Sequence, residues 1–239
     1  MIIQGDPYSF PITGELNPKR TALMVIDMQR DFCDPSGYMH TRGEDVGAAR
    51  AIVPRIKAVC SAARRAGMSL VFTREGHRPN LSDLPESKRL KTRRSGAEIG
   101  SPGPLGRLLI RGEHGWDFID DLRPEEGDTV IDKSGTGSFH GTELDTILRN
   151  QGIQHLILTG VTTGVCVSST AREAADRGYS VLVLGDCCAE PDRENHLMAL
   201  RLLKIEGGYL ATVADSRAFL AGLKPTSQCT DRRSAHDER

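Results

Sequence analysis

The sequence predicts an α/β fold, a three-layer α-β-α sandwich around a doubly wound sheet of about six mainly parallel strands. Apolar runs rich in β-branched residues alternate along the chain with runs of helical spacing. Glycines follow three of the helical runs, at Gly67, Gly152 and Gly178, where a helix commonly ends. This alternation is typical of right-handed crossovers between parallel strands.

The individual elements are expected from the length and spacing of these runs. Six apolar runs are predicted strands, at 21–27, 68–73, 128–132, 153–160, 179–186 and 209–213. Helices are predicted between or after them, at 46–66, 141–150, 163–177, 192–206 and near 215–222. Pro54 lies inside the first of these helices, so we expect a kink there.

A chain of 239 residues is long enough for one sizeable core, and we expect a single domain over 1–222. The stretch 75–118 does not fit a simple crossover and is predicted to be an insertion that serves as a lid or an interface. Its basic cluster at 88–94 is expected to be a solvated face, with an oligomer contact or a pocket cover as alternatives. The charged segment 223–239 is expected to be a disordered tail.

The composition excludes several classes of protein. A net charge of −1 and a pI near 6.7 favour neither nucleic acid nor an anionic membrane as a partner. We find no apolar run of the ~18 residues that cross a bilayer and no secretory leader, so a cytoplasmic protein is expected. The six cysteines form no CxxC pair, which argues against a zinc site or a disulfide framework.

Three chemically capable side chains follow three predicted strands. Asp27, Lys133 and Cys166 should meet, because the carboxyl ends of parallel strands share one edge of the sheet. Cys166 falls on the first turn of a predicted helix, whose dipole favours a thiolate with a lowered pKa. The alternatives are a buried, inert thiol for Cys166 and a structural ion pair of Lys133 with Asp132 or Asp27. Cys33 is a rival nucleophile, ranked lower because no helix begins beside it.

The segments 25–32, 132–139 and 160–167 resemble the three signature segments of the isochorismatase-like cysteine hydrolases, and they occur in the same order. The resemblance covers roughly residues 18–222. It implies a triad of Asp27, Lys133 and Cys166, an oxyanion hole formed by the amides of Thr162 and Cys166, and a cis peptide bond at Val161–Thr162. It also implies a homo-oligomer, either a dimer or a tetramer.

A thiolate splits amide hydrolysis into acylation and deacylation, which have lower barriers than direct attack by water. Cys166 is the expected nucleophile, and Asp27 is expected to take the thiol proton, pass it to departing ammonia and later activate water. Lys133 is expected to hold Asp27 and to stabilise the anionic forms.

No cofactor and no metal are expected. Gly135-Thr136-Gly137 follows a strand, but the dinucleotide-binding pattern fails at His140. The histidines show no metal-binding spacing, so His77 and His140 are expected to be polar loop residues. The histidines of the metal cluster found in nicotinamide-hydrolysing members of the resembled family have no match in this sequence.

The substrate prediction follows from the resemblance. Family members that cleave isochorismate generally lack the cysteine, so Cys166 favours an amide or a ureide. The phrase 72–85 resembles the biuret-hydrolase branch, which predicts a small linear ureide of the biuret or triuret type. The alternative within the family is ureidoacrylate or an N-carbamoyl amino acid. Alternatives of another class are a redox-sensing thiol protein, with Cys33 as the resolving cysteine, and a non-catalytic ligand-binding relative.

Four residues are candidates for substrate binding. Glu206 stands where the biuret-hydrolase pattern has glutamine, and its carboxylate suits a donor-rich ureide such as triuret, unless it simply faces solvent at a helix end. Phe32 and Phe139 could form walls against a planar ureide or pack in the core. Arg74 could donate to a substrate carbonyl or pair with Glu75.

Overall fold

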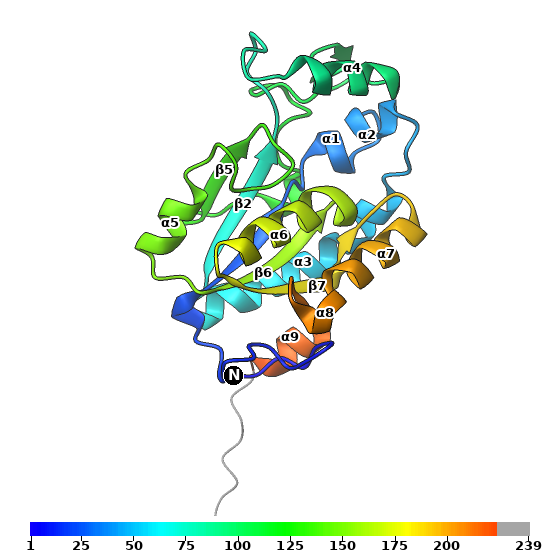
Figure 1. The fold of residues 1–239 in the computed structure, drawn as a ribbon. Helices are drawn as coiled ribbons and strands as arrows, with labels where there is room; N and C mark the ends of the chain where they lie inside the picture. Colours follow the sequence, from blue (N-terminus) through cyan, green and yellow to red (C-terminus); the bar gives the residue numbers. More distant parts are fainter. Residues whose placement is uncertain (224–239) are drawn as a thin grey trace, which may run out of the picture.

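Six parallel strands form the central sheet of the computed structural model, which describes residues 1–223. The strand order is β5-β2-β1-β6-β7-β8. The chain adds β2 and β5 on one side of β1, and then β6, β7 and β8 on the other (Figure 1). This arrangement confirms the predicted doubly wound sheet. The strands are β1 (Thr21–Ile26), β2 (Ser69–Glu75), β5 (Thr129–Lys133), β6 (His155–Val161), β7 (Ser180–Ala189) and β8 (Thr212–Ala214).

The predicted helices are present, although their ends differ from the prediction by a few residues. They are α3 (Gly47–Ala66), α5 (Leu144–Asn150), α6 (Ser168–Asp176), α7 (Arg193–Leu203) and α9 (Ser216–Gly222). Helix α3 continues through Pro54, so the proline does not end it. The helix expected over 163–177 begins with a π-helical turn at Thr163–Val167, and α6 follows. Four short helices were not predicted: α1 (Arg30–Cys33), α2 (Tyr38–Thr41), α4 (Glu86–Arg94) and α8 (Ile205–Gly208).

Helices cover both faces of the sheet because side chains alternate along each strand. On β1, Leu23 and Val25 belong to the core cluster that includes α3 and α9. Met24 and Ile26 belong to the opposite cluster, which includes residues of α5 and α6. Each buried aliphatic side chain of this kind contributes about 1.5–3 kcal/mol relative to an exposed one. The two clusters therefore fix β1 in the middle of the sandwich.

The insertion at 75–118 lies beyond the carboxyl ends of β1 and β2 (Figure 1). It contains α4 and a small antiparallel pair, β3 (Pro102–Gly103) with β4 (Gly106–Arg107). Ile99 and Leu109 of this segment are buried in the main core, so it is packed against the body of the protein. His77 lies in the loop between β2 and α4, as expected, but it is fully buried, and its backbone N–H donates to the carbonyl of Leu109.

The basic cluster at 88–94 is only partly a solvated face. Arg89 and Arg93 pair with Glu98, whereas Lys88 extends toward the sheet edge and donates to Glu75 and to the carbonyl of Ser134. Over residues 1–223, we find no helix with the length and hydropathy of a membrane span. The predicted tail lies outside the described residues, apart from Leu223.

Candidate active site

Asp27 follows the last residue of β1, and the backbone turns sharply at this position. Its φ of 53° lies in the left-handed region, which aspartate tolerates better than most residues. The Asp27 N–H donates to the carbonyl and hydroxyl oxygens of Thr73, each at 3.2 Å. The Thr73 hydroxyl in turn donates to Asp27 Oδ1 at 2.6 Å. Adjacent strand β2 therefore holds the carboxylate in one orientation.

Lys133 is the last residue of β5 and is almost fully buried. Its Nζ lies 2.8 Å from Asp27 Oδ2 and donates to the carbonyl oxygens of Gly135 and Thr136, each at 3.0 Å. The two carbonyls orient the ammonium, and Asp27 balances its charge. An unpaired lysine is not tolerated at such depth, so the predicted meeting of Asp27 and Lys133 has a clear physical reason.

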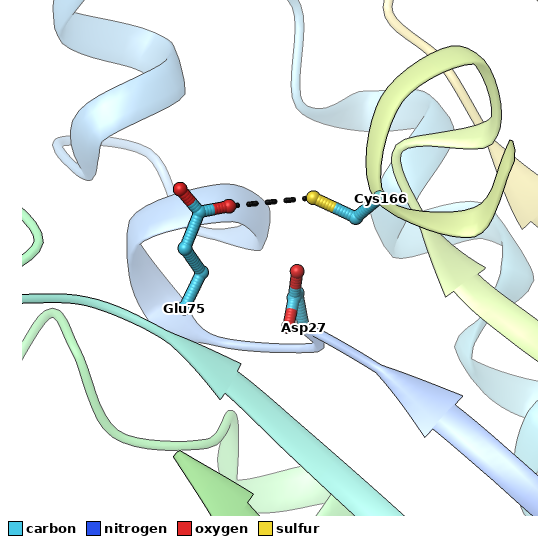
Figure 2. Close-up of side chains that lie close together, drawn as sticks. All are labelled: Asp27, Glu75 and Cys166. Atoms are coloured by element: carbon cyan, nitrogen blue, oxygen red, sulfur yellow. Dashed lines mark hydrogen bonds between the residues drawn. The ribbon is translucent and has the colours of Figure 1, made fainter. Parts of the chain in front are cut away.

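Cys166 lies in the π-helical turn after β6, where only 5% of its surface is exposed. Strand β6 approaches β1 closely at Gly160, where a Cβ atom would overlap the carbonyl oxygen of Ile26. This approach brings the turn to the end of β1. The peptide bond at Val161–Thr162 is cis, as the resemblance implied. Donor atoms of Asp27, Glu75 and Cys166 all lie within 4.8 Å of one another (Figure 2).

Glu75 is the site residue that the sequence did not predict. The thiol of Cys166 donates to Glu75 Oε2 at 3.3 Å, and Lys133 Nζ lies 3.6 Å from the same oxygen (Figure 2). Lys88 of α4 donates to Glu75 Oε1 at 2.7 Å. The predicted strand ended at residue 73, which left Glu75 in the insertion. The observed strand β2 ends at Glu75, so the rule that identified Lys133 applies to it as well.

The expectation of a lowered cysteine pKa is wrong for this structure. Burial raises the pKa of the Cys166 thiol well above its ordinary value, Lys133 opposes this effect, and the carboxylates of Asp27 and Glu75 add to it. The depth of the site explains the difference from a thiol on an exposed first turn. The resting nucleophile is a thiol, and its proton must leave during the reaction.

The two carboxylates are perturbed in opposite directions. Burial raises the pKa of Asp27 above its ordinary value, although Lys133 opposes this effect. Burial also disfavours ionisation of Glu75, but Lys133 and Lys88 together outweigh it and hold the pKa of Glu75 below its ordinary value. The same carboxylates hold the pKa of Lys133 above its ordinary value despite burial. The resting site thus contains an ionised Glu75 and two ammonium groups.

A cavity of about 360 Å³ opens above the thiol. Phe32, Thr162 and Cys166 line it, as do Glu75 and Lys88. Asp27 and Lys133 lie outside this lining and are almost fully buried. The structure therefore brings the predicted triad together at the base of a cavity of the size expected for a small ligand.

Three of the four predicted substrate-binding residues lie outside this cavity. Arg74 donates to Asp132 and Asp117 and lies over the Trp116 ring, so it pairs with neither a substrate carbonyl nor Glu75. Phe139 is buried in the core and stacks on Tyr179. Glu206 is exposed on α8, at the end of the molecule opposite α4, as its solvent-facing alternative predicted (Figure 1).

Cys33 is fully buried in the core cluster around α3 and is not part of the cavity lining. Burial raises the pKa of its thiol. Its position therefore supports packing rather than nucleophilic attack or disulfide exchange with Cys166.

Among residues 1–223, Asp27, Glu75 and Cys166 are the group whose donor atoms are spaced for a metal ion. Lys133 lies between the two carboxylates, at 2.8 Å from one and 3.6 Å from the other, and already supplies positive charge to both. The donor set therefore does not call for a metal, and the prediction that none is used stays a prediction.

Comparisons with known proteins agree with this geometry. A family model described as the isochorismatase domain matches residues 21–215. The chain is 35% identical over 222 residues to the ureidoacrylate amidohydrolase RutB of Caulobacter vibrioides. The alignment covers 88% of this chain and 95% of that protein. The corresponding RutB of Caulobacter segnis is 33% identical over 220 residues, with 88% of this chain and 90% of that protein covered.

Solved structures give the same picture. A cysteine hydrolase from Pseudomonas syringae pv. phaseolicola superposes on this structure with a TM-score of 0.73 at 27% identity. The superposition covers 87% of this chain and 94% of the hydrolase chain. An N-carbamoylsarcosine amidase from Thermoplasma acidophilum superposes with a TM-score of 0.63 at 30% identity. The superposition covers 82% of this chain and 96% of the amidase chain. These relatives are not named for biuret or triuret, so the comparisons support the alternative substrate prediction better than the main one.

Proposed function

This chain belongs to the isochorismatase family and is an amidohydrolase that acts on C–N bonds, and we propose that its substrate is a ureido compound, R–NH–CO–NH₂. The products are ammonia and the N-carboxylated remainder of the substrate. One observation carries the proposal: the Cys166 thiol lies at the base of a cavity of about 360 Å³, beside the buried Asp27–Lys133 ion pair. A ureido group is small and planar enough to enter such a cavity.

The reaction proceeds through an acyl-enzyme. Cys166 Sγ forms a bond to the ureido carbonyl carbon as its proton moves to a carboxylate, and the C–N bond breaks as the proton reaches the departing nitrogen. In the second half, Asp27 takes a proton from water, the oxygen adds to the same carbon, and the proton returns to Sγ. The backbone amides of Thr162 and Cys166 are the proposed donors to the transient oxyanion.

Arg42 gives the cavity a cation for a substrate carboxylate, beside the acidic lining residues Glu44, Glu190 and Asp192. Lys88 is engaged by Glu75 at 2.7 Å, whereas the ion pair of Arg42 with Glu44 spans 3.7 Å. The Arg42 guanidinium lies 5.7 Å from the Tyr38 ring centroid, on the cavity wall. Of the two cations that line the cavity, Arg42 is therefore the one that is more weakly paired and would bind a substrate carboxylate. Together with the named relatives, this favours ureidoacrylate or an N-carbamoyl amino acid over biuret and triuret, which carry no carboxylate.

An ammonia-release assay over a panel of compounds tests the proposal. The panel contains ureidoacrylate, N-carbamoyl amino acids, biuret, triuret and nicotinamide. The expected result is the highest kcat/KM for a carboxylate-bearing ureido compound. Arg42→Gln is expected to raise KM for that compound roughly 10- to 100-fold, the value of one bond of about 1.5–3 kcal/mol to a charged group, and to leave turnover of biuret unchanged.

Glu206→Gln is the matched control, because Glu206 is exposed and outside the cavity. In this variant, the relative kcat/KM values for triuret, biuret and ureidoacrylate are expected to equal those of the wild type. Preferred hydrolysis of biuret or triuret, with no effect of Arg42→Gln, contradicts the choice of a carboxylate-bearing substrate and restores the original prediction. Absence of ammonia from every compound contradicts the proposed activity itself.

A further inference from the structure

Glu190 is an acidic residue of the cavity wall that lies beside the turn carrying Cys166. It directly follows Ala189, the last residue of β7. Thr162, whose amide is a proposed oxyanion donor, directly follows Val161, the last residue of β6. Val161 and Ala189 are paired in the sheet, so the two strands end at the same level. The carboxyl ends of these neighbouring strands therefore place Glu190 next to Thr162.

This alignment of the strand ends results from a change of register. Leu158 pairs with Val183, whereas Gly160 pairs with Cys188. Strand β7 thus advances farther than β6 over the same stretch, as it does at a β-bulge, where a strand bends and its side chains are redirected. The irregularity extends β7 to the nucleophile turn, beyond residue 186 at which the predicted strand ended.

The Glu190 carboxylate binds the backbone of this turn. The Gly164 N–H donates to Glu190 Oε2 at 2.7 Å. A Cβ atom at Gly164 would lie only 3.1 Å from the same oxygen, so the close contact depends on the glycine. The preceding residue is held as well, because the Thr163 hydroxyl and His196 Nδ1 on α7 are 2.8 Å apart. Side chains from two elements thus hold successive residues of the turn.

The orientation of this turn decides where its N–H groups point. Thr162, Val165 and Cys166 line the cavity, whereas Gly164 does not. The Gly164 N–H is engaged by Glu190 and is not a donor to a substrate. An oxyanion donor is effective only when it is held within hydrogen-bond distance of the developing charge. Holding Gly164 therefore also holds the amides of Thr162 and Cys166 on either side of it.

The contact between Glu190 and Gly164 is suited to positioning rather than to proton transfer. Burial raises the pKa of the Glu190 carboxyl above its ordinary value, and the Gly164 N–H opposes this effect. A carboxyl oxygen accepts a hydrogen bond from an N–H group in either protonation state. The hydrogen bond to the turn therefore does not require Glu190 to gain or lose a proton.

We propose that Glu190 is a positioning residue, which orients the amides of Thr162 and Cys166 toward the transient oxyanion through its hydrogen bond to Gly164. This proposal rests on the proposed function and leaves the roles of the triad unchanged. The oxyanion exists only during the reaction, so the contact is expected to affect kcat rather than KM.

Two variants separate the hydrogen-bond acceptor from the charge. Glu190→Gln and Glu190→Ala both remove the negative charge, but only alanine removes the oxygen that accepts from Gly164. With the best ureido substrate of the panel, Glu190→Gln is expected to retain the wild-type kcat. Glu190→Ala is expected to have a kcat about 10- to 100-fold below that of Glu190→Gln, less than the 10²- to 10³-fold effect of losing an oxyanion donor outright.

KM is not expected to rise in either variant, because each removes a negative charge from the wall that an anionic substrate approaches. Arg42→Gln is expected to do the reverse and to raise KM. A general acid–base role for Glu190 would impair Glu190→Gln as much as Glu190→Ala. Equal kcat values in these two variants therefore overturn the proposal.

Hydrolysis of p-nitrophenyl acetate tests the same turn without a ureido substrate. Attack by Cys166 Sγ on the ester carbonyl passes through an oxyanion and releases p-nitrophenolate as a burst, with Cys166→Ala as the background. The burst is expected to be about tenfold or more slower in Glu190→Ala than in Glu190→Gln. Equal burst rates, or a wild type without a burst, overturn the positioning role. A slower burst in Glu190→Ala, with no ammonia from any compound, supports this role and contradicts the ureido substrate alone.

Alkylation of Cys166 by iodoacetamide distinguishes positioning from a general loss of structure. Displacement at an alkyl carbon forms no oxyanion, so the alkylation rates of Glu190→Gln and Glu190→Ala are expected to be equal. Equal losses of alkylation and of the ester burst in Glu190→Ala indicate a disordered site and overturn the specific role. Glu194→Ala is the matched control, because Glu194 is exposed on α7 and lies outside the cavity lining. It is expected to leave kcat, the burst and alkylation unchanged.

Discussion

The Cys166 thiol illustrates how depth decides the chemistry of one residue. It is buried beside two carboxylates, and burial raises its pKa despite the neighbouring lysine. Cys166→Ser is expected to retain the fold and ligand binding while turnover falls on the order of 10³-fold or more, because a serine hydroxyl stays protonated where a thiolate forms. Mass spectrometry of substrate-treated protein should show a covalent adduct on the wild type only. Normal ammonia release by the serine variant is the contrary outcome.

Thr73 adjusts the proton affinity of Asp27. Its hydroxyl donates to Oδ1 at 2.6 Å, which favours the ionised carboxylate against the opposing effect of burial. Thr73→Val removes that donor, so the pKa of Asp27 is expected to rise further. A base works only when ionised, and the acid limb of the pH–rate profile should therefore move up by about 1–2 pH units, equivalent to a charge-assisted bond of about 1.5–3 kcal/mol. An acid limb at the wild-type pH counts against this role.

At the scale of elements, the contact between β1 and β6 brings the carboxylate and the thiol together. Gly160 has a φ of 109°, and a Cβ atom there would overlap the carbonyl oxygen of Ile26. Gly160→Ala is expected to lower the free energy of unfolding by on the order of 3 kcal/mol, because both the backbone conformation and the close approach are lost. Chemical denaturation followed by circular dichroism measures the change. Gly43→Ala, also at a positive φ but with open space around it, is expected to cost less.

At the scale of the whole molecule, an apolar stripe remains exposed along α7 and α8. Met198 and Leu202 are exposed and lie four residues apart on α7, and Ile205 of α8 and its C-cap Tyr209 are also exposed, Tyr209 by 75%. Such a stripe favours a self-contact, in line with the homodimer or homotetramer that the resemblance implied. Light scattering at micromolar concentration is expected to give a dimer or a larger assembly, and Leu202→Glu is expected to give a monomer. A monomeric wild type contradicts the prediction.

The sequence by itself determined the order of strands and helices and the family, and it predicted that the three proposed triad residues lie together. Asp27, Lys133 and Cys166 each follow an apolar strand, and parallel strands present their carboxyl ends at one edge. That rule needs no knowledge of distances. It also applies to Glu75, but the pattern placed the end of β2 two residues too early, at residue 73 rather than at Glu75.

Only the tertiary structure decided which side chains enter the cavity. Arg74 and Glu75 are neighbours in the sequence, yet alternate residues of a strand face opposite ways, so Glu75 meets the thiol while Arg74 meets Asp132 and Asp117. The tertiary structure also brought Lys88 from α4 to Glu75 and left Glu206 in solvent. The pKa values of the site depend on burial and on charges contributed by separate elements, which a single sequence does not place in space.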